Sequence, residues 1–172
     1  MQELITYISK HIYIQYIVIS FIIIIITYVK TNKKAISFLT GYCFLVIAET
    51  ILTRPTYLKF TYRTKLFWSY THWEEKNQII MNILIFIPIG ISGWFIWKRK
   101  TVLYSFIFSL IIETVQLITK KGMFEFDDIF HNTLGTIIGM LIALCITKCF
   151  QVFNKKDENN SNRYKKNDNR WN

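Results

Sequence analysis

Five long apolar segments constrain the fold of this chain more than any other feature. Crossing the hydrocarbon core of a bilayer takes about 20 mostly apolar residues, with about 17 as the lower limit. The segments that meet this length are Ile12–Val29, Ile36–Leu52, Ile79–Trp97, Val102–Ile118 and Ile129–Phe150. Hydrophobic residues make up 52% of the chain, and they come in blocks separated by basic loops. We therefore predict an all-α polytopic membrane protein, a helical bundle of about five transmembrane helices.

The remaining segments are short, so the sequence predicts one transmembrane domain over residues 12–150 and no soluble domain. Residues 1–11 form a short N-terminal lead on the outer side. Residues 151–172 form a polar tail that is rich in Asn and Lys. A tail of this composition cannot bury enough apolar surface to fold, so we expect it to be disordered in the cytoplasm.

The net charge of +10 is divided unequally between the two predicted membrane faces. With five spans, thirteen Lys and Arg residues fall on the side of the C-terminus and eight on the side of the N-terminus. The short loops between the first and second spans and between the third and fourth spans carry the strongest bias. The positive-inside rule then predicts a multi-pass protein of the plasma membrane, with the N-terminus outside and the C-terminus cytoplasmic.

The predicted outer connection, Thr53 to Gln78, interleaves aromatic residues with Lys and Arg. In a soluble protein, this mixture is typical of single-stranded nucleic acid binding. Next to a bilayer, it is typical of rings at the headgroup level with cations beside phosphates. We call this segment the aromatic loop. We expect membrane lipid as its partner and no nucleic acid.

Polar residues near the ends of four spans fall toward the same predicted membrane face, whichever way the protein is oriented. They are Arg54, Asn82, Glu113, Gln116, Asp127, Asp128 and Asn132. Ionisable groups in lipid are costly and usually face the interior of a bundle. We therefore predict that these residues surround a polar pocket at the outer side.

Three chemical roles are open for this pocket. Carboxylates with an amide could hold Mg²⁺ or Ca²⁺, or one carboxyl could act as an acid or a base. A network that only ties helices together is the third alternative. The sequence shows no activated nucleophile, and we assign no catalytic residue, no cofactor and no metal ligand. Asp127 or Asp128 is also well placed to cap the last helix.

Small residues in the third and fifth spans predict close helix packing. Gly135 and Gly139 form a GxxxG pattern, which lets two backbones approach closely. Pro88 and Gly90 lie in the third span, where Pro88 cannot donate a backbone hydrogen bond. We interpret these four residues as helix-packing positions.

Several separated motifs occur in the order found in one membrane family. They are Arg54, WSY (Trp68–Tyr70), NILIFIPIG (Asn82–Gly90), SLIIETVQL (Ser109–Leu117) and FEFDDIFHNTLGTIIG (Phe124–Gly139). On these motifs the chain resembles the VanZ-like membrane proteins over roughly residues 36–145, with the first span and the tail outside the resemblance. It departs from the family in having Glu125 where Asp is common, and Gly122 and Met123 where an Arg is frequent.

The resemblance implies a role at the cell envelope of Gram-positive bacteria and reduced susceptibility to the glycopeptide teicoplanin. Our first hypothesis is a non-enzymatic protein whose outer pocket and aromatic loop engage teicoplanin, a cell-wall precursor or a lipid. The alternative hypothesis is an intramembrane enzyme that modifies an envelope lipid or cell-wall precursor, with Glu113, Asp127 and Asp128 as its acid, base or metal ligands.

Overall fold

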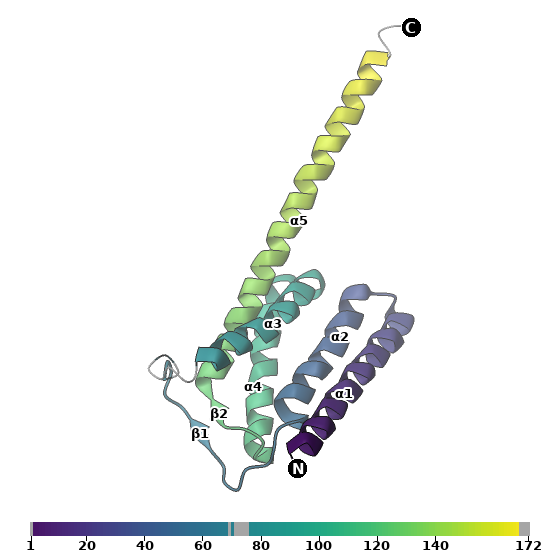
Figure 1. Cartoon of the computed structure of the whole chain (residues 1–172). Coiled ribbons are helices and arrows are strands. Elements are labelled where there is room, and N and C mark those ends of the chain that lie inside the picture. Colours follow the sequence, from purple (N-terminus) through teal and green to yellow (C-terminus); the bar gives the residue numbers. More distant parts are fainter. Residues whose placement is uncertain (1, 69, 71–75, 169–172) are drawn as a thin grey trace.

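The computed structural model describes residues 2–68, 70 and 76–168, and the side chains of residues 13–68, 70 and 76–155. Five helices dominate it (Figure 1): α1 (Gln2–Thr31), α2 (Lys34–Ile47), α3 (Lys76–Trp97), α4 (Thr101–Thr119) and α5 (Phe126–Asp168). A π-helical turn, Ala48–Leu52, extends α2, and a 3₁₀ turn, Lys98–Lys100, joins α3 to α4. Two short strands, β1 (Tyr62–Arg63) and β2 (Phe124–Glu125), flank α3 and α4 in the chain.

Four helical stretches are long and apolar enough to cross a membrane: Tyr13–Thr31, Lys34–Leu52, Lys76–Thr119 and Phe126–Lys155. The third stretch contains both α3 and α4, because only the 3₁₀ turn separates them. Four of the five predicted apolar segments therefore lie within α1, α3, α4 and α5, and the second extends over α2 and its π-helical turn. The prediction of an all-α membrane bundle is confirmed.

The two ends of the chain differ from the sequence expectation. α1 begins at Gln2, so the predicted N-terminal lead is part of a helix. α5 continues to Asp168, so the described part of the predicted tail is also helical rather than irregular. Adding residues to a helix that already exists avoids the unfavourable nucleation step, so a polar segment can extend a transmembrane helix.

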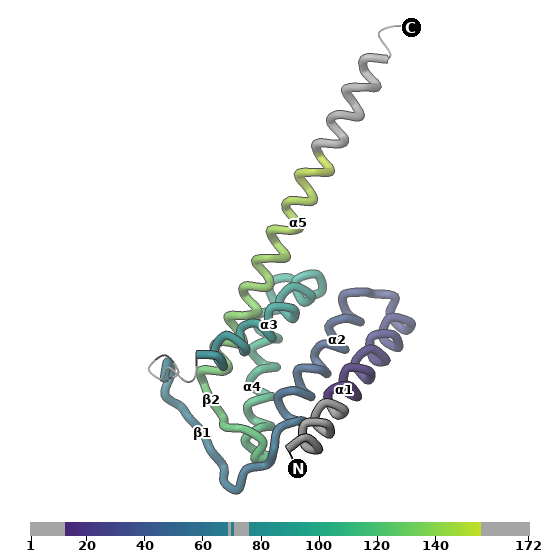
Figure 2. Tube along the Cα trace, viewed as in Figure 1, coloured from purple at the N-terminus to yellow at the C-terminus, as the bar shows by residue number. Residues whose placement is uncertain are grey.

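Connections gather at two opposite ends of the bundle (Figure 2). The N-terminal end of α1, the described part of the aromatic loop and the link from α4 to α5 lie at one end (Figure 1), which we call the loop end. The α1–α2 connection and the turn between α3 and α4 lie at the other end, toward which α5 runs and beyond which it projects. α3 begins at Lys76, so the last three residues of the predicted aromatic loop are helical.

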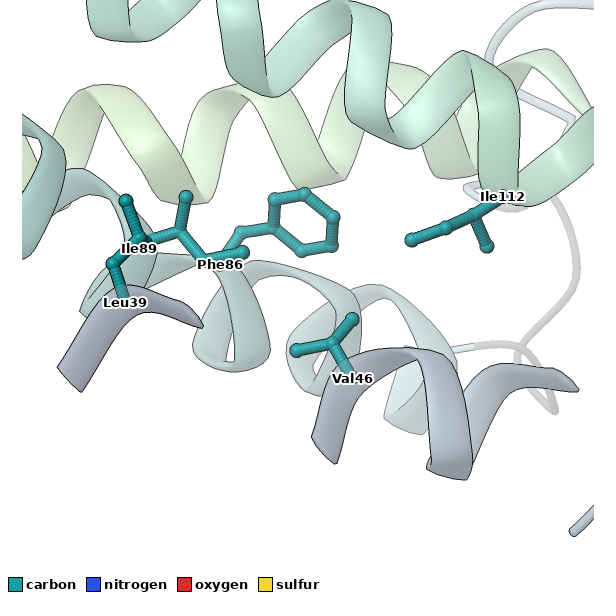
Figure 3. Packing of buried hydrophobic residues seen from close by; sticks show 5 residues of the cluster. All are labelled: Leu39, Val46, Phe86, Ile89 and Ile112. Carbon is teal, nitrogen blue, oxygen red and sulfur yellow. The ribbon is translucent and has the colours of Figure 1, made fainter. Parts of the chain in front are cut away.

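The apolar core lies between α2, α3 and α4. Its buried members are Leu39, Val46, Phe86, Ile89 and Ile112, and Figure 3 shows them between these helices. Tyr42 and Ile85 pack against this core, and the Tyr42 hydroxyl donates a hydrogen bond of 2.9 Å to the Ile85 carbonyl, which ties α2 to α3. α1 packs on the far side of α2, where the Ser20 hydroxyl donates to the Gly41 carbonyl.

α3 and α5 are in close backbone contact at three glycine positions, where no larger side chain fits. A Cβ added to Gly90, Gly135 or Gly139 would lie 2.1–2.2 Å from a carbonyl oxygen of the facing helix. Pro88 lies within α3, one turn before Ser92, whose hydroxyl donates to the Pro88 carbonyl. The small residues of both helices therefore place the start of α5 firmly against α3.

Candidate functional site

A polar cavity of about 290 Å³ opens at the loop end of the bundle. Its walls come from the aromatic loop, the start of α3, the link between α4 and α5, and the start of α5. The residues that give it its charge and hydrogen-bonding capacity are Arg54, Tyr57, Arg63, Gln78, Glu125 and Asp128. Because these residues are far apart in sequence, the cavity depends on how the aromatic loop is held.

Backbone pairing holds the aromatic loop against the link between α4 and α5. β1 and β2 run parallel, with Arg63 in register with Glu125. The Tyr57 N–H donates a hydrogen bond of 2.7 Å to the Lys120 carbonyl, and the Phe124 N–H donates one of 3.1 Å to the Thr61 carbonyl. This pairing places Arg63 of the aromatic loop beside Glu125 of the link between α4 and α5.

The Arg63–Glu125 ion pair forms one wall of the cavity. Nη1 of Arg63 lies 2.7 Å from Oε1 of Glu125, and the guanidinium carbon stands 3.4 Å over the Trp68 ring. The Gln78 side-chain amide donates to Glu125 at 3.4 Å and to Asp128 at 3.2 Å. One neutral amide from α3 thus bridges the two carboxylates and stabilises both by hydrogen bonding.

Glu113 lies behind this wall, with only 2% of its surface exposed. Its Oε2 atom accepts a hydrogen bond of 3.1 Å from the backbone N–H of Glu125 in β2, directly before α5. Arg54, Glu125 and Asp128 are near enough to interact with it electrostatically. Glu113 therefore fixes the link between α4 and α5 and adds a third carboxyl group to the site.

Arg54 is a second cation of the cavity, and it interacts electrostatically with Glu113. Among the described residues, no hydrogen bond or ion pair to its guanidinium is present, whereas Arg63 is paired with Glu125. A guanidinium with five N–H donors in a polar cavity can bind a carboxylate or a phosphate at two points. The cavity therefore offers a donor fork as well as carboxylate acceptors.

Asp127 faces the aromatic loop rather than the cavity. Its Oδ1 atom accepts a hydrogen bond from the Phe67 N–H. One turn further along α5, Nε2 of His131 lies 3.1 Å from the Tyr70 hydroxyl, and Phe130 makes an edge contact with the Phe67 ring. These contacts pin the loop to α5 a second time.

The helix-capping expectation changes in detail. Asp127 and Asp128 both lie inside the first turn of α5, after its first residue, Phe126, rather than at the capping position before it. Their charges still face the positive end of the helix dipole, which is where acidic residues stabilise a helix. The reason is that the preceding backbone is extended in β2, so the helix begins directly after Glu125.

The remaining predicted pocket residues lie between helices, outside the cavity. The Gln116 amide donates to the Thr50 carbonyl at 3.0 Å, and the Asn132 amide donates to the Ser109 hydroxyl at 2.8 Å. Nδ2 of Asn82 is buried and has no hydrogen-bond partner among the described residues. Of the seven predicted residues, the structure therefore places Arg54 and Asp128 in the cavity wall and Glu113 directly behind it.

Arg63, Gln78 and Glu125 belong to the cavity, although the sequence reasoning did not select them. Glu125 lies in β2 and Asp127 in the first turn of α5, so the change from extended to helical backbone gives the two side chains different directions, and the sequence does not mark where that change occurs. Arg63 was one of several cations in the aromatic loop, and no pattern in the sequence distinguishes the one that pairs. In the part of the chain that the structure describes, no group of three or more His, Cys, Asp or Glu residues is arranged to hold a metal ion.

Comparison with known proteins places this architecture in a family. Residues 13–148, which are more than half of the 172 residues, match the sequence model of the VanZ/LLP1 family. The match begins at residue 13, near the start of the first apolar segment, so it includes most of α1, which the resemblance described above left outside. No curated protein and no solved structure matches the chain.

Proposed function

Because this chain belongs to the VanZ/LLP1 family, we propose that it lowers the susceptibility of a Gram-positive cell to teicoplanin from the outer face of the plasma membrane. In this proposal the protein is not an enzyme. It engages the antibiotic, a cell-wall precursor or a lipid through the polar cavity and the aromatic loop beside it.

The observation that carries the proposal is the cavity at the loop end, which holds charges of both signs. Burying such groups in a membrane protein is expensive, and they usually mark a functional site. The aromatic loop supplies exposed rings beside the cavity, including Tyr57, Phe60 and Tyr62. Rings with an apolar face and a polar edge are enriched where protein meets headgroups, which is where an envelope ligand is accessible.

The orientation is part of the same proposal. The basic turn Lys98–Lys100 lies at the end opposite the loop end (Figure 1). The positive-inside rule then places that end, with the C-terminus, in the cytoplasm and the loop end outside. Cysteine labelling with a membrane-impermeant reagent tests this topology. Labelling of a residue introduced in the aromatic loop, and not of one at Arg99, is the expected result.

The proposed function is tested by the inhibitory concentrations of teicoplanin and vancomycin on a susceptible host. The strains carry an empty vector, the unchanged protein, or its Glu113→Gln and Asp128→Asn variants at matched membrane levels. Protection against teicoplanin that both variants lose is the expected result. A matched control is Glu49→Gln, since Glu49 is exposed and does not line the polar cavity. Absence of protection by the unchanged protein contradicts the proposal.

A second candidate function is an intramembrane enzyme that modifies an envelope lipid or precursor. Three carboxyl groups, those of Glu113, Glu125 and Asp128, gather at one cavity, and such an arrangement can supply an acid and a base. Mass spectrometry of envelope lipids and precursors from cells with and without the protein distinguishes the two functions. A new or depleted species supports the enzyme, and identical profiles exclude it for the compounds measured.

A further inference from the structure

The carboxylates of the polar cavity are engaged within the protein, whereas the N–H donors of one guanidinium are not. The Glu125 carboxylate is held by Arg63 at 2.7 Å and accepts from the Gln78 amide. Asp128 also accepts from Gln78 and has further interactions within the protein. Among the described residues, no hydrogen bond or ion pair reaches the Arg54 guanidinium, which lines the same cavity. The donors that remain for a ligand are therefore those of Arg54.

Two lysines extend the positive charge on the Arg54 side of the cavity. Lys120 and Lys121 directly follow α4, and both are half-buried. Nζ of Lys121 donates at 3.5 Å to the carbonyl of Leu52, two residues before Arg54, and Nζ of Lys120 lies 4.6 Å from the centre of the Phe60 ring. In the described part of the chain, neither lysine is paired with a carboxylate. Three cations thus gather where α2 and α4 end.

From this arrangement we infer that the cavity binds a phosphate monoester group, which Arg54 holds at two points while Lys120 and Lys121 balance its second negative charge. The inference rests on the proposed function, because it names the class of ligand for the same cavity. A phosphate monoester carries a charge of about −1.5 to −2 near neutral pH and three strong acceptor oxygens. A guanidinium presents a planar fork of N–H donors that matches two of these oxygens.

Neutral donors and the size of the cavity also suit a phosphate group. Tyr57 and Thr61 line the cavity, and a hydroxyl can donate to a further phosphate oxygen. The cavity volume of about 290 Å³ lies at the lower end of small-molecule sites, which run from about 300 to 1,000 Å³. A phosphate with a small substituent fits this space, so a larger envelope molecule would enter it only with its phosphate end.

The charge balance favours a monoester over a diester. Arg54 interacts electrostatically with the buried carboxyl group of Glu113, but this group forms no hydrogen bond with the guanidinium. Against the three cations, Glu113 contributes at most one negative charge. The excess positive charge attracts a dianion more strongly than a monoanion of similar size. We therefore expect a phosphate monoester to bind more tightly than a monoanionic diester, and a zwitterionic diester to bind least.

Native mass spectrometry of the full chain in detergent tests this order. The probes are short-chain phosphatidic acid, phosphatidylglycerol and phosphatidylcholine with identical acyl chains, which carry a monoester, a monoanionic diester and a zwitterionic diester. We expect saturable binding of phosphatidic acid that is roughly 10- to 100-fold tighter than that of phosphatidylcholine, as for one or more charged hydrogen bonds. Phosphatidylglycerol should fall between them. Phosphatidic acid that binds no more tightly than phosphatidylglycerol overturns the inference.

Variants locate the site. Arg54→Gln should remove most of the preference for the monoester, and Lys121→Gln should weaken it several-fold. The matched controls Arg99→Gln and Lys100→Gln should retain it, because both residues are exposed at the opposite end of the bundle. Full preference in Arg54→Gln overturns the assignment. If this variant does not fold, Lys121→Gln and Tyr57→Phe decide the question, and full preference in both of them overturns the assignment.

Competition by glycerol 3-phosphate separates the two sources of the group. Displacement of phosphatidic acid at similar concentrations identifies a water-soluble phosphoester as the ligand, and displacement only at much higher concentrations identifies a lipid. Both results support a phosphate site in the cavity. Phosphatidic acid that glycerol 3-phosphate does not displace at any concentration overturns it.

The inhibitory concentration of teicoplanin, measured for the same variants, separates this inference from the proposed function. Protection by a protein that shows no preference for the monoester overturns this inference alone. Preference for the monoester without protection overturns only the resistance function.

Discussion

Replacing Gly139 by alanine places a methyl group where α3 leaves no room for one. The added Cβ would lie 2.1 Å from the Ile87 carbonyl oxygen and 3.0 Å from the Ile91 nitrogen. An ordinary contact begins at 3.4 Å, so the two helices must separate by roughly 1.3 Å at this point. Backbone atoms form the obstacle, so no side-chain rotation can relieve the clash.

Two opposing effects set the magnitude. Overpacking of this kind costs about 1–3 kcal/mol. Alanine also gains up to about 1 kcal/mol over glycine in a helix interior. Because backbone atoms are the obstacle, the cost should lie in the upper part of this range, about 2–3 kcal/mol. After the gain of about 1 kcal/mol, we expect Gly139→Ala to lower the free energy of unfolding by about 1–2 kcal/mol. Adding Gly135→Ala should cost less than the sum of the two changes, because the first substitution already separates the helices.

Denaturant titration in mixed micelles, followed by tryptophan fluorescence, measures this change. The matched control is Cys145→Val, which enlarges an exposed residue on the same helix and should leave stability unchanged. A Gly139→Ala protein that is as stable as the unchanged one, or more stable, would refute the close contact between α3 and α5. Helix propensity alone predicts that Gly139→Ala raises the free energy of unfolding, so the direction of the change distinguishes the two effects.

The other predictions concern polar contacts. Arg63→Gln removes the ion pair with Glu125 and should release the aromatic loop, seen as several-fold faster proteolysis at the loop end; the stability loss should be about 1–3 kcal/mol, below that of a fully buried pair. Ser109→Ala leaves the buried amide of Asn132 without its 2.8 Å partner and should cost about 1–3 kcal/mol in the same titration. Asn82→Leu removes a buried amide nitrogen that has no partner, so stability should be unchanged or higher.

Each of these three predictions has a control or a result that would contradict it. Arg99→Gln removes an exposed cation at the opposite end and should leave proteolysis of the aromatic loop unchanged. Full stability of Ser109→Ala would mean that Asn132 finds another partner. A clear loss of stability in Asn82→Leu would show that its amide nitrogen is satisfied in the membrane, for example by water.

The sequence predicts the helices well because membrane spans impose a strong, local requirement for length and apolarity. At the boundaries inside the chain, the five predicted segments agree with the observed helices within a few residues. The ends of the chain were less predictable. α5 extends beyond Phe150 because adding residues to a helix that has already formed avoids the nucleation cost. The composition of the tail alone does not reveal this effect.

The site was predictable only in part, for a physical reason. Because the chain changes side with each span, the sequence shows which polar residues lie at one membrane face. It does not show which of them point into the same cavity. Asn132 and Gln116 share that face with Asp128, yet they bond across helix contacts instead. The pairing of Arg63 with Glu125 depends on the parallel register of β1 and β2, and two-residue strands carry no sequence signal of their own.

The close contact between α3 and α5 also bears on how the protein is assembled. α3 packs more extensively against α5 than against its chain neighbour α4. A growing chain therefore delivers α3 to the membrane before its main partner has been synthesised. Until α5 arrives, the surface of α3 around Gly90 stays open to lipid or to the insertion machinery. A chain that stops before Gly135 should consequently be a substrate for membrane quality control, even though three of its four apolar stretches are complete.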